Sequence, residues 1–431
     1  MTYLKATVLI SLFTFSVSYS FSQLGITGQY KTRGEFANGY QQPLMDSDLP
    51  SFYVAQRTRL GAYYTHERFK FEFTIQDVRT WGNTSNIAID NKGFLSVYEA
   101  NLSLYLNKKW STKIGRQPIS YDNDRIFGSL DWAMQARRHD ALIVKFRDNG
   151  WSIDLGATYN NERSSNNHII YELNNYKTFQ YVWANKEWEE FSVSVLFLNN
   201  GMERIYFQDS VKKGAIMYSQ TFGTHLEYKK EKIDITGFGY FQTGKDKTNN
   251  NINAYNASIE GTYKPNDKWK ISLGGELLSG SSQELNADNT NRSFSPLYGT
   301  NHKFNGYMDY FYVGNHEKNV GLIDGYLKGG FKVGKFTFGL ANHFFFAAAP
   351  VITESGPINP EVIQMDPFLG YEADFTIKYQ FIDEIAIELG YSQFFDTSTL
   401  REVKGTGNQK TNNWTYLMLT AKPFKNFKLF K

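Results

Sequence analysis

The sequence contains no cysteine among its 431 residues, which excludes disulfides, thiolate metal sites and a lipidated cysteine. Histidine is scarce, and His302 beside Lys303 has poor metal-ligand spacing, so we predict neither a metal site nor a cofactor. After the first two dozen residues, no run is apolar enough for a transmembrane helix. The net charge of +3 is close to neutral and argues against nucleic acid as a partner.

What the chain does contain is a repeated alternation of apolar and polar residues. Residues 69–75, 98–106, 336–340, 371–379 and 385–391 all alternate in this way. A period of two predicts strands whose two faces differ. A soluble β-sandwich would show the same alternation, so this pattern alone does not distinguish a soluble protein from a membrane protein.

The connections between the predicted strands distinguish the two classes. We predict strands at 24–36, 53–65, 68–79, 94–106, 110–119, 139–147, 151–160, 178–187, 190–199, 216–229, 231–243, 252–264, 268–278, 322–334, 335–346, 367–380, 384–395 and 412–422. A tight turn follows each even-numbered strand, and a longer polar segment follows each odd-numbered one, the longest at 279–321. Outer-membrane barrels have this asymmetry, with short periplasmic turns and long outer loops.

We therefore predict an all-β fold, a single membrane-spanning antiparallel β-barrel of about 18 strands, in the outer membrane of a Gram-negative bacterium. Aromatic residues make up 17% of the chain and are available for belts at the membrane interfaces. Residues 1–22 are predicted to be a cleaved export signal, and residues 23–431 the barrel. A barrel of this width encloses an aqueous lumen.

Charge is concentrated at residues 113–146, which are dense in Arg and Asp for a segment between strands. Pro118 removes a ladder donor and is expected to end the fifth strand. The connection that follows can fold inward and narrow the channel with its charges, or it can be a solvated outer loop. Both interpretations stay open at the level of sequence.

The same region resembles the alginate-export porin family. The resemblance rests on Gly115-Arg-Gln117, on Leu130-Asp-Trp132 and on the Arg-rich stretch that leads to His139-Asp140. Shorter pieces in the expected order are found at 57–61, 75–82, 97–100 and 297–309. The resemblance implies an 18-stranded outer-membrane channel that passes an anionic uronate polysaccharide through an arginine-rich constriction, by passive diffusion.

The resemblance also implies a set of site residues. The pore-lining cations would be Arg57, Arg59, Arg79, Arg116, Arg125, Arg137, Arg138 and Lys145, with Asp77, Asp124, Asp131 and Asp140 as counter-charges. A guanidinium pairs side by side with a carboxylate, and interspersed Asp residues would keep binding weak enough for release. Several Arg–Asp pairs could instead brace an inward loop. Strand parity places Arg79 and Arg116 on the apolar face, so a bulge or a position above the bilayer has to be assumed for them.

Two other classes of function are weighed. A surface-binding or adhesion barrel would use the long outer loops without needing a charged constriction. An outer-membrane hydrolase could use Ser129, Asp131 and His139, but no nucleophile motif frames them, and we predict that the chain is not an enzyme. The partners expected are an anionic polysaccharide or another anionic solute, outer-membrane lipid, and periplasmic export or uptake components.

Overall fold

A computed structural model describes residues 23–45, 47–85, 94–167, 169–173, 175–283, 289–316, 320–354, 362–406 and 411–424. The predicted export signal at 1–22 lies outside these residues. Within the described part, no helix is both long and apolar enough to cross a membrane.

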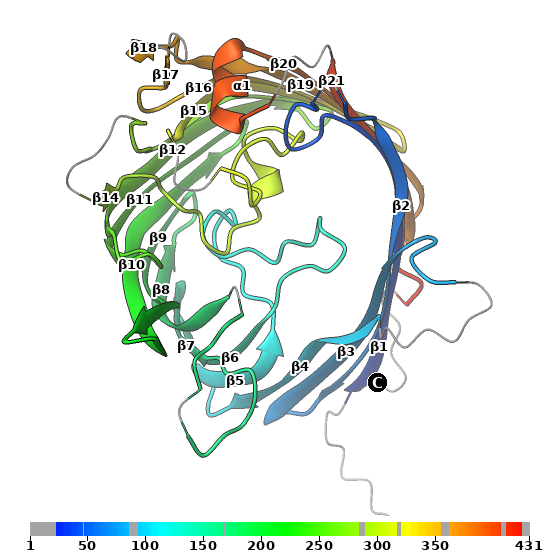
Figure 1. The fold of residues 1–431 in the computed structure, drawn as a ribbon. Coiled ribbons are helices and arrows are strands. Elements are labelled where there is room, and N and C mark those ends of the chain that lie inside the picture. The colour runs from blue at the N-terminus through cyan, green and yellow to red at the C-terminus, as the bar shows by residue number, and fades with distance from the viewer. Residues whose placement is uncertain are drawn as a thin grey trace, which may run out of the picture.

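Eighteen antiparallel strands form one closed wall (Figure 1). They are β1 Gln23–Asn38, β2 Ser51–Thr65, β3 Phe69–Thr80, β4 Leu95–Tyr105, β5 Trp110–Gln117, β6 His139–Asp148, β7 Trp151–Tyr159, β8 Tyr176–Glu187, β9 Phe191–Gln208, β10 Val211–Lys230, β11 Ile233–Lys245, β12 Asn251–Asn266, β13 Trp269–Leu278, β15 Leu322–Val333, β16 Phe336–Phe346, β19 Phe368–Ile382, β20 Ile385–Asp396 and β21 Asn412–Ala421. The wall closes because β1 pairs with both β2 and β21. Each predicted strand overlaps one of these, so the predicted 18-stranded barrel is confirmed.

Shorter elements lie in the connections at the long-loop end. They are β14 Thr290–Asn291, the 3-10 turn η1 Asn301–Lys303, β17 Ile352–Glu354, β18 Val362–Gln364 and the helix α1 Ser398–Lys404. The two residues of β14 pair in parallel with β12, and β17 pairs with β18 in a separate ribbon.

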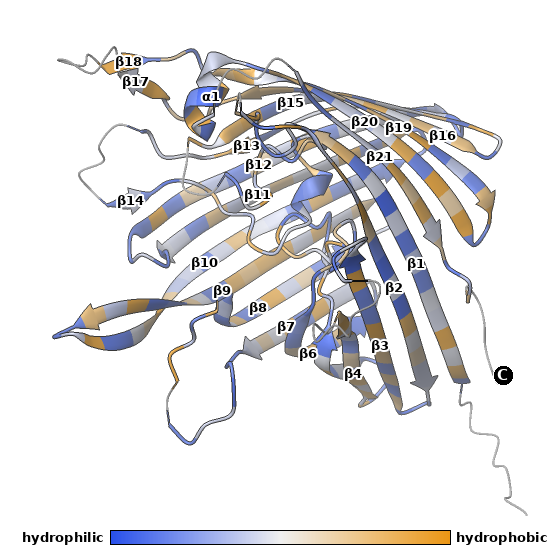
Figure 2. Ribbon diagram, turned by 45° about the vertical axis from the view of Figure 1, so that its right-hand side comes forward, coloured by the Kyte–Doolittle hydropathy of each residue, from blue (hydrophilic) through white to orange (hydrophobic). Residues whose placement is uncertain are grey.

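The wall is polar on the inside and apolar on the outside. In β13, Ser272 and Glu276 are buried, whereas Leu273 between them is 68% exposed. Figure 2 shows the resulting alternation of hydrophilic and hydrophobic residues along the strands. A soluble sandwich would bury its apolar face, so this exposed apolar face is a lipid-facing surface.

The tight turns are all found where they were predicted, but one long outer connection is not a loop. Strands β9 and β10 continue as a ladder to Gln208 and Val211, where the prediction had a loop at 200–215. Asp209 and Ser210 both have positive φ, 50° and 62°. Two such residues form a turn that matches the twist of the paired strands, so pairing can continue up to it. Figure 2 shows this hairpin extending past the neighbouring strands.

Two long connections turn into the lumen (Figure 1), and we call them lumen loop A, residues 118–138, and lumen loop B, residues 292–316. They join each other through a parallel bridge between Phe127 and Tyr298, with the Tyr298 amide donating to Ile126 O at 3.0 Å. The ring of Phe127 also lies 5.5 Å from that of Phe179 on the wall. The interior therefore contains a packed aromatic core, although no separate plug domain is present among the described residues.

The lipid-facing wall leads to a test of the membrane assignment. Changing Leu273 to Arg places a charge about halfway along a lipid-facing strand, which should lower the free energy of unfolding by roughly 2–4 kcal/mol in a bilayer. Urea unfolding in lipid vesicles, followed by tryptophan fluorescence, measures this. Leu49→Arg, in the exposed connection before β2, is the control and should have little effect. Equal effects of the two changes would contradict a lipid-facing position for Leu273.

Candidate functional site

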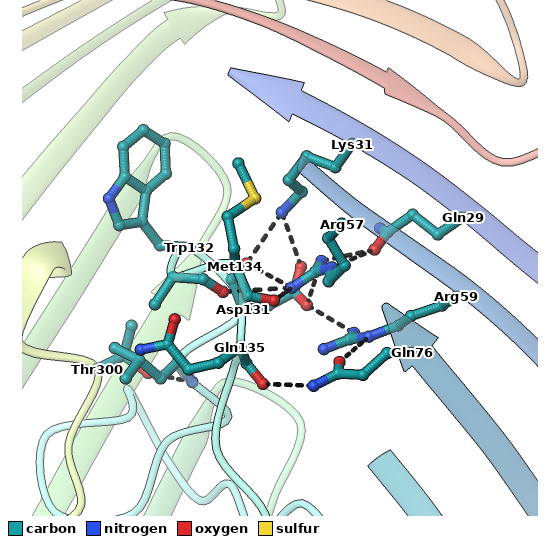
Figure 3. A network of polar contacts seen from close by, with 12 residues as sticks. Gln29, Lys31, Arg57, Arg59, Gln76, Asp131, Trp132, Met134, Gln135 and Thr300 are labelled. Carbon is teal, nitrogen blue, oxygen red and sulfur yellow. Dashed lines mark hydrogen bonds and ion pairs between the residues drawn. The ribbon is translucent and has the colours of Figure 1, made fainter. Parts of the chain in front are cut away.

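Arg57 fastens lumen loop A to the barrel wall (Figure 3). From β2, its Nη1 donates to the carbonyl oxygens of Ala133 and Met134 at 3.3 and 3.2 Å. Its Nη2 donates to Asp131 Oδ1 at 2.8 Å, and its Nε donates to Gln29 Oε1 at 3.1 Å. The side chain of Arg57 is 0% exposed. Arg57 is therefore a structural anchor that a passing solute cannot reach.

Three cations converge on the carboxylate of Asp131. Besides Arg57, Lys31 Nζ lies 3.2 Å from Oδ2 and Arg59 Nη1 lies 3.0 Å from Oδ1. Burial would raise the pKa of Asp131, but the charges of Lys31, Arg57 and Arg59 outweigh it and hold the pKa below its ordinary value. Asp131 is therefore ionised at neutral pH, and its charge holds the loop against β1 and β2.

Arg59 and Gln76 extend this anchor to β3. Arg59 Nε donates to Gln76 Oε1 at 2.9 Å, and Gln76 Nε2 donates to Gln135 O at 3.0 Å (Figure 3). The guanidinium of Arg59 also lies 3.6 Å above the centre of the Tyr98 ring. The anchor network, which we define as Lys31, Arg57, Arg59, Gln76 and Asp131, thus joins three strands to one loop.

Two further arginines connect the lumen loops to each other and to the opposite wall. Arg125 of loop A is 0% exposed, with Nε 2.7 Å from Glu276 of β13. Its Nη2 donates to Asn305 of loop B at 3.1 Å. Arg137 donates from Nη1 to Gly299 O at 2.8 Å. These contacts fix the two loops as one unit.

The remaining residues predicted on the lumen side have more modest roles. Arg138 donates to Gln135 O at 3.3 Å, within its own loop. Asp124 accepts from Lys303 at 3.3 Å, so it ties loop A to loop B. Lys145 lies on the inner wall and donates to Asp154 at 2.8 Å.

Four of the predicted site residues lie on the other side of the wall. Their chain neighbours Gln76, Gln117 and His139 are buried on the inner face. Because successive side chains of a strand alternate between faces, Asp77, Arg79, Arg116 and Asp140 lie on the outer face. This corrects the prediction that these four line the pore. The parity of Arg79 and Arg116 in their strands was the correct guide to their position.

A chamber of about 720 Å³ lies in the lumen on the turn side of the two loops. The cations that line it are Lys270, Lys303, Lys328 and Lys378. The carboxylates that line it are Glu227, Glu260, Glu276, Asp324, Asp374 and Glu388. Three of the six are buried and engaged, Glu276 by Arg125, Asp324 by His343 and Asp374 by Ser392. Two of the four lysines are engaged as well, Lys303 by Asp124 at 3.3 Å and Lys328 by Glu260 at 3.6 Å.

A second cavity lies beside the chamber, toward the turn-side mouth. It has a volume of about 500 Å³ and shares Lys270 and Thr337 with the chamber. Its lining contains Lys232, Lys264, Lys268, Lys270 and Lys332, against Glu231 and Asp267. Sequence reasoning missed all of these lysines because they are scattered over several strands and turns, with no local motif. Lys270, Lys328 and Lys378 could have been identified, because each is a basic residue at an inward-facing position of an amphipathic strand.

Aromatic faces form the roof of the chamber. Trp132 of loop A stacks on His302 of loop B at 4.2 Å, and His302 Nδ1 lies 2.7 Å from Asp309. His302 is thus part of the contact between the loops. Among the described residues, no group of three His, Asp or Glu side chains could hold a metal ion.

The residues considered for hydrolysis are not arranged as a catalytic relay. Asp131 is held by the anchor network, while His139 Nδ1 lies 2.8 Å from the hydroxyl of Tyr176. The ring of His139 also packs against Phe127. Each of the two side chains therefore contributes to the packing of loop A.

Neither a protein-family model nor a curated protein matches the chain. Solved structures do match in fold. OccK11 (OpdR) of Pseudomonas aeruginosa matches with a TM-score of 0.58 at 9% identity, covering 95% of this chain and 96% of that chain. OccAB1 of Acinetobacter baumannii matches with 0.58 at 10%, covering 94% and 97%. OpdK of Pseudomonas aeruginosa, solved with vanillate, matches with 0.55 at 8%, covering 92% and 98%.

These likenesses show the fold of a porin-type outer-membrane barrel. Together with the apolar outer wall, the fold places the chain in the outer membrane. At 8–10% identity the likenesses carry no statement about catalysis, so the absence of enzymatic activity stays a prediction. They give no support to the alginate-export family, so that resemblance stays a prediction.

The anchor network leads to a test of how loop A is held. Changing Arg57 to Gln removes the donors to the carbonyl oxygens of Ala133 and Met134, and each carbonyl left buried without a donor costs about 1–3 kcal/mol. We expect faster deuterium exchange at residues 131–136 and new protease cleavage there. Arg68→Gln, at an exposed arginine in the turn after β2, is the matched control and should leave the loop protected. Unchanged protection in Arg57→Gln would contradict the anchoring role.

The pKa of Asp131 leads to a pH dependence. Because its folded pKa lies below the ordinary value of 3.8, the carboxylate stabilises the anchored loop at any pH above that value. This contribution disappears as the pH falls through the folded pKa. Deuterium exchange of residues 131–136 should therefore be insensitive to pH from neutrality down to about pH 4, after correction for intrinsic rates, and should accelerate only in stronger acid.

Asp131→Asn provides the comparison for the pH experiment. In this variant, the amides of residues 131–136 should exchange quickly at neutral pH, and their exchange should not accelerate further in acid. A loop that loosens between pH 5 and 7 in the native protein would show that another group controls it.

Proposed function

We propose that this chain is an outer-membrane channel that passes carboxylated solutes by diffusion, with uronate oligosaccharides as the preferred class. The observation that carries the proposal is the lysine-lined chamber, adjacent to a lysine-rich mouth, inside a barrel narrowed by two anchored loops. A wide barrel without such loops would be a general pore. The ion pairs hold the two loops in one arrangement, and a defined binding path needs residues that are held in place by supporting contacts.

The charges along this path favour anions. Lys270 lines both cavities, so eight lysines line the path, together with five carboxylates that are not buried, Glu227, Glu231, Glu260, Asp267 and Glu388. In a narrow channel with low-dielectric walls, such an excess raises the local concentration of anions. The carboxylates that remain accessible keep binding weak enough for a solute to leave.

The chamber also presents ring faces beside its cations. Trp132, Phe304, Tyr307, Tyr326 and Tyr416 line it together with the lysines. Flat apolar faces next to charged donors suit a sugar acid, which has both a ring and a carboxylate. OpdK, a barrel of the same fold, was solved with vanillate, a small ring that carries a carboxylate. That likeness supports the same chemistry in this chamber, and the volume favours short oligomers.

The mechanism differs from an arginine-lined constriction. Arg57 and Arg125 are fully buried and hold the loops, so the lysines provide the contacts along the path. A lysine ammonium is a flexible point charge, and it orients a carboxylate less strongly than a guanidinium does. Passage along lysines should therefore be fast and weakly selective among carboxylates.

Planar-bilayer recording of the purified protein tests the proposal. We expect a reversal potential that shows anion preference in a salt gradient, and block by uronate trimers at low salt that neutral trimers of the same size do not produce. Lys303→Gln combined with Lys328→Gln should weaken the block about fivefold per lysine, since a solvated ion pair contributes up to about 1 kcal/mol.

Lys109→Gln is the control for this experiment, because Lys109 lies in the exposed turn before β5 and pairs with Asp148. It should leave block and selectivity unchanged. Absence of conductance would contradict the channel. Conductance with cation preference, unaffected by the lysine changes, would contradict the anionic substrate class while leaving the channel intact.

A further inference from the structure

The four charged residues on the outer wall are not needed by the channel. Arg79 binds Asp77 through two nitrogens, and Arg116 binds Asp140 in the same way, at 2.9 and 2.8 Å. They belong to β3, β5 and β6, on the face directed away from the lumen. A lumen path therefore does not explain them.

The two ion pairs lie on either side of β4 and at different levels along it, because Asp77 is opposite Leu95 and Arg116 is opposite Ala100, five residues further along β4. Arg116 Nη1 reaches Val97 O at 3.5 Å. Only β4 separates the two pairs. We call Asp77, Arg79, Arg116 and Asp140 the outer-wall patch.

The patch lies at the upper limit of the lipid-facing band. Toward the turn side, the same faces of the same strands carry Phe73, Ile114 and Leu142, all exposed and apolar. Toward the long-loop side, the exposed Trp81 donates to Gln56, as expected for an indole at a membrane interface. Charged side chains on a barrel wall cost little at this depth, about 0–1 kcal/mol. From the apolar residues below and Trp81 above, we infer that the head groups of the outer leaflet lie at this level.

The two arginines keep part of their surface for another contact. Arg79 is 39% exposed and Arg116 37%, in contrast to the fully buried Arg57 and Arg125. Each guanidinium has five N–H donors in a plane, and a bidentate carboxylate uses only two of them. The bound carboxylates fix the direction of the remaining donors.

We propose that Arg79 and Arg116 each bind a phosphate of a phosphorylated lipid head group in the outer leaflet. Phosphate matches the planar, bidentate donors of arginine, and its position at the membrane surface matches the level of the patch. The acyl chains of such a lipid would lie along the apolar wall below, and Leu95 and Trp81 flank the head group. A second copy of the chain is the competing occupant, and it is distinguished below.

Lipid retention by the full-length protein tests this. The protein is placed in nanodiscs of neutral phosphatidylcholine doped with a phosphorylated glycolipid, or with the same glycolipid after its phosphates are removed, and native mass spectrometry counts the retained glycolipid. We expect retention of the phosphorylated form only. The double variant Arg79→Gln/Arg116→Gln should retain about one tenth as much phosphorylated glycolipid as the unaltered protein, or less. Lys109→Gln should retain the same amount as the unaltered protein.

Further arms separate the alternatives. Arg79→Lys/Arg116→Lys keeps the charge but loses the bidentate donors, so its retention should be intermediate. Excess inorganic phosphate should not displace the lipid, because the acyl chains contribute to binding; displacement would show an ion site and overturn the lipid assignment. Loss of a dimer mass in the double variant, with lipid retention unchanged, would show a protein interface and also overturn it.

Folding and channel function serve as controls that do not depend on the proposed substrate. All variants should keep the conductance and selectivity of the unaltered protein, because the outer-wall patch does not reach the lumen. Equal retention of phosphorylated and dephosphorylated glycolipid would contradict the site even if the channel is anion-selective.

Discussion

The contact between Arg57 and residues 131–134 spans the space between the barrel wall and lumen loop A, and the arrangement of the lumen depends on it. A polypeptide segment that enters a lumen has to satisfy its backbone carbonyls. The buried guanidinium satisfies two of them and neutralises Asp131 at the same time. Loop B then rests on loop A through Arg125, Arg137 and the Phe127–Tyr298 bridge.

This anchoring divides the work between two kinds of cation. Arginine has planar donors suited to several fixed acceptors, and here it holds the loops or, on the outer wall, pairs with aspartates. Lysine has a single mobile charge, and here eight lysines line the chamber and the turn-side mouth, whereas Lys31 belongs to the anchor network and Lys303 also pairs with Asp124. A protein with arginines along the path and lysines holding the loops would have the same net charge. Burial decides between them, because a side chain with no exposed surface cannot contact a solute.

The strands could be predicted because each is a local pattern with a period of two, and their number follows from counting. The hairpin of β9 and β10 was missed because its turn, Asp209-Ser210, lies in a polar stretch that resembles a loop. The anchor network could not be derived from periodicity, since Arg57 and Asp131 are 74 residues apart and meet only once the barrel closes. Residue type alone could not show that Arg79 faces lipid while Arg59 faces the lumen; their parity could.

The most direct measurement is the single-channel conductance of a variant in which residues 121–136 are replaced by a short Gly-Ser linker between β5 and β6. If loop A, held by Arg57, narrows the path, this variant should conduct several-fold more in the same salt and pass oligosaccharides that the unaltered protein excludes. A folded variant with unchanged conductance and selectivity would contradict the account.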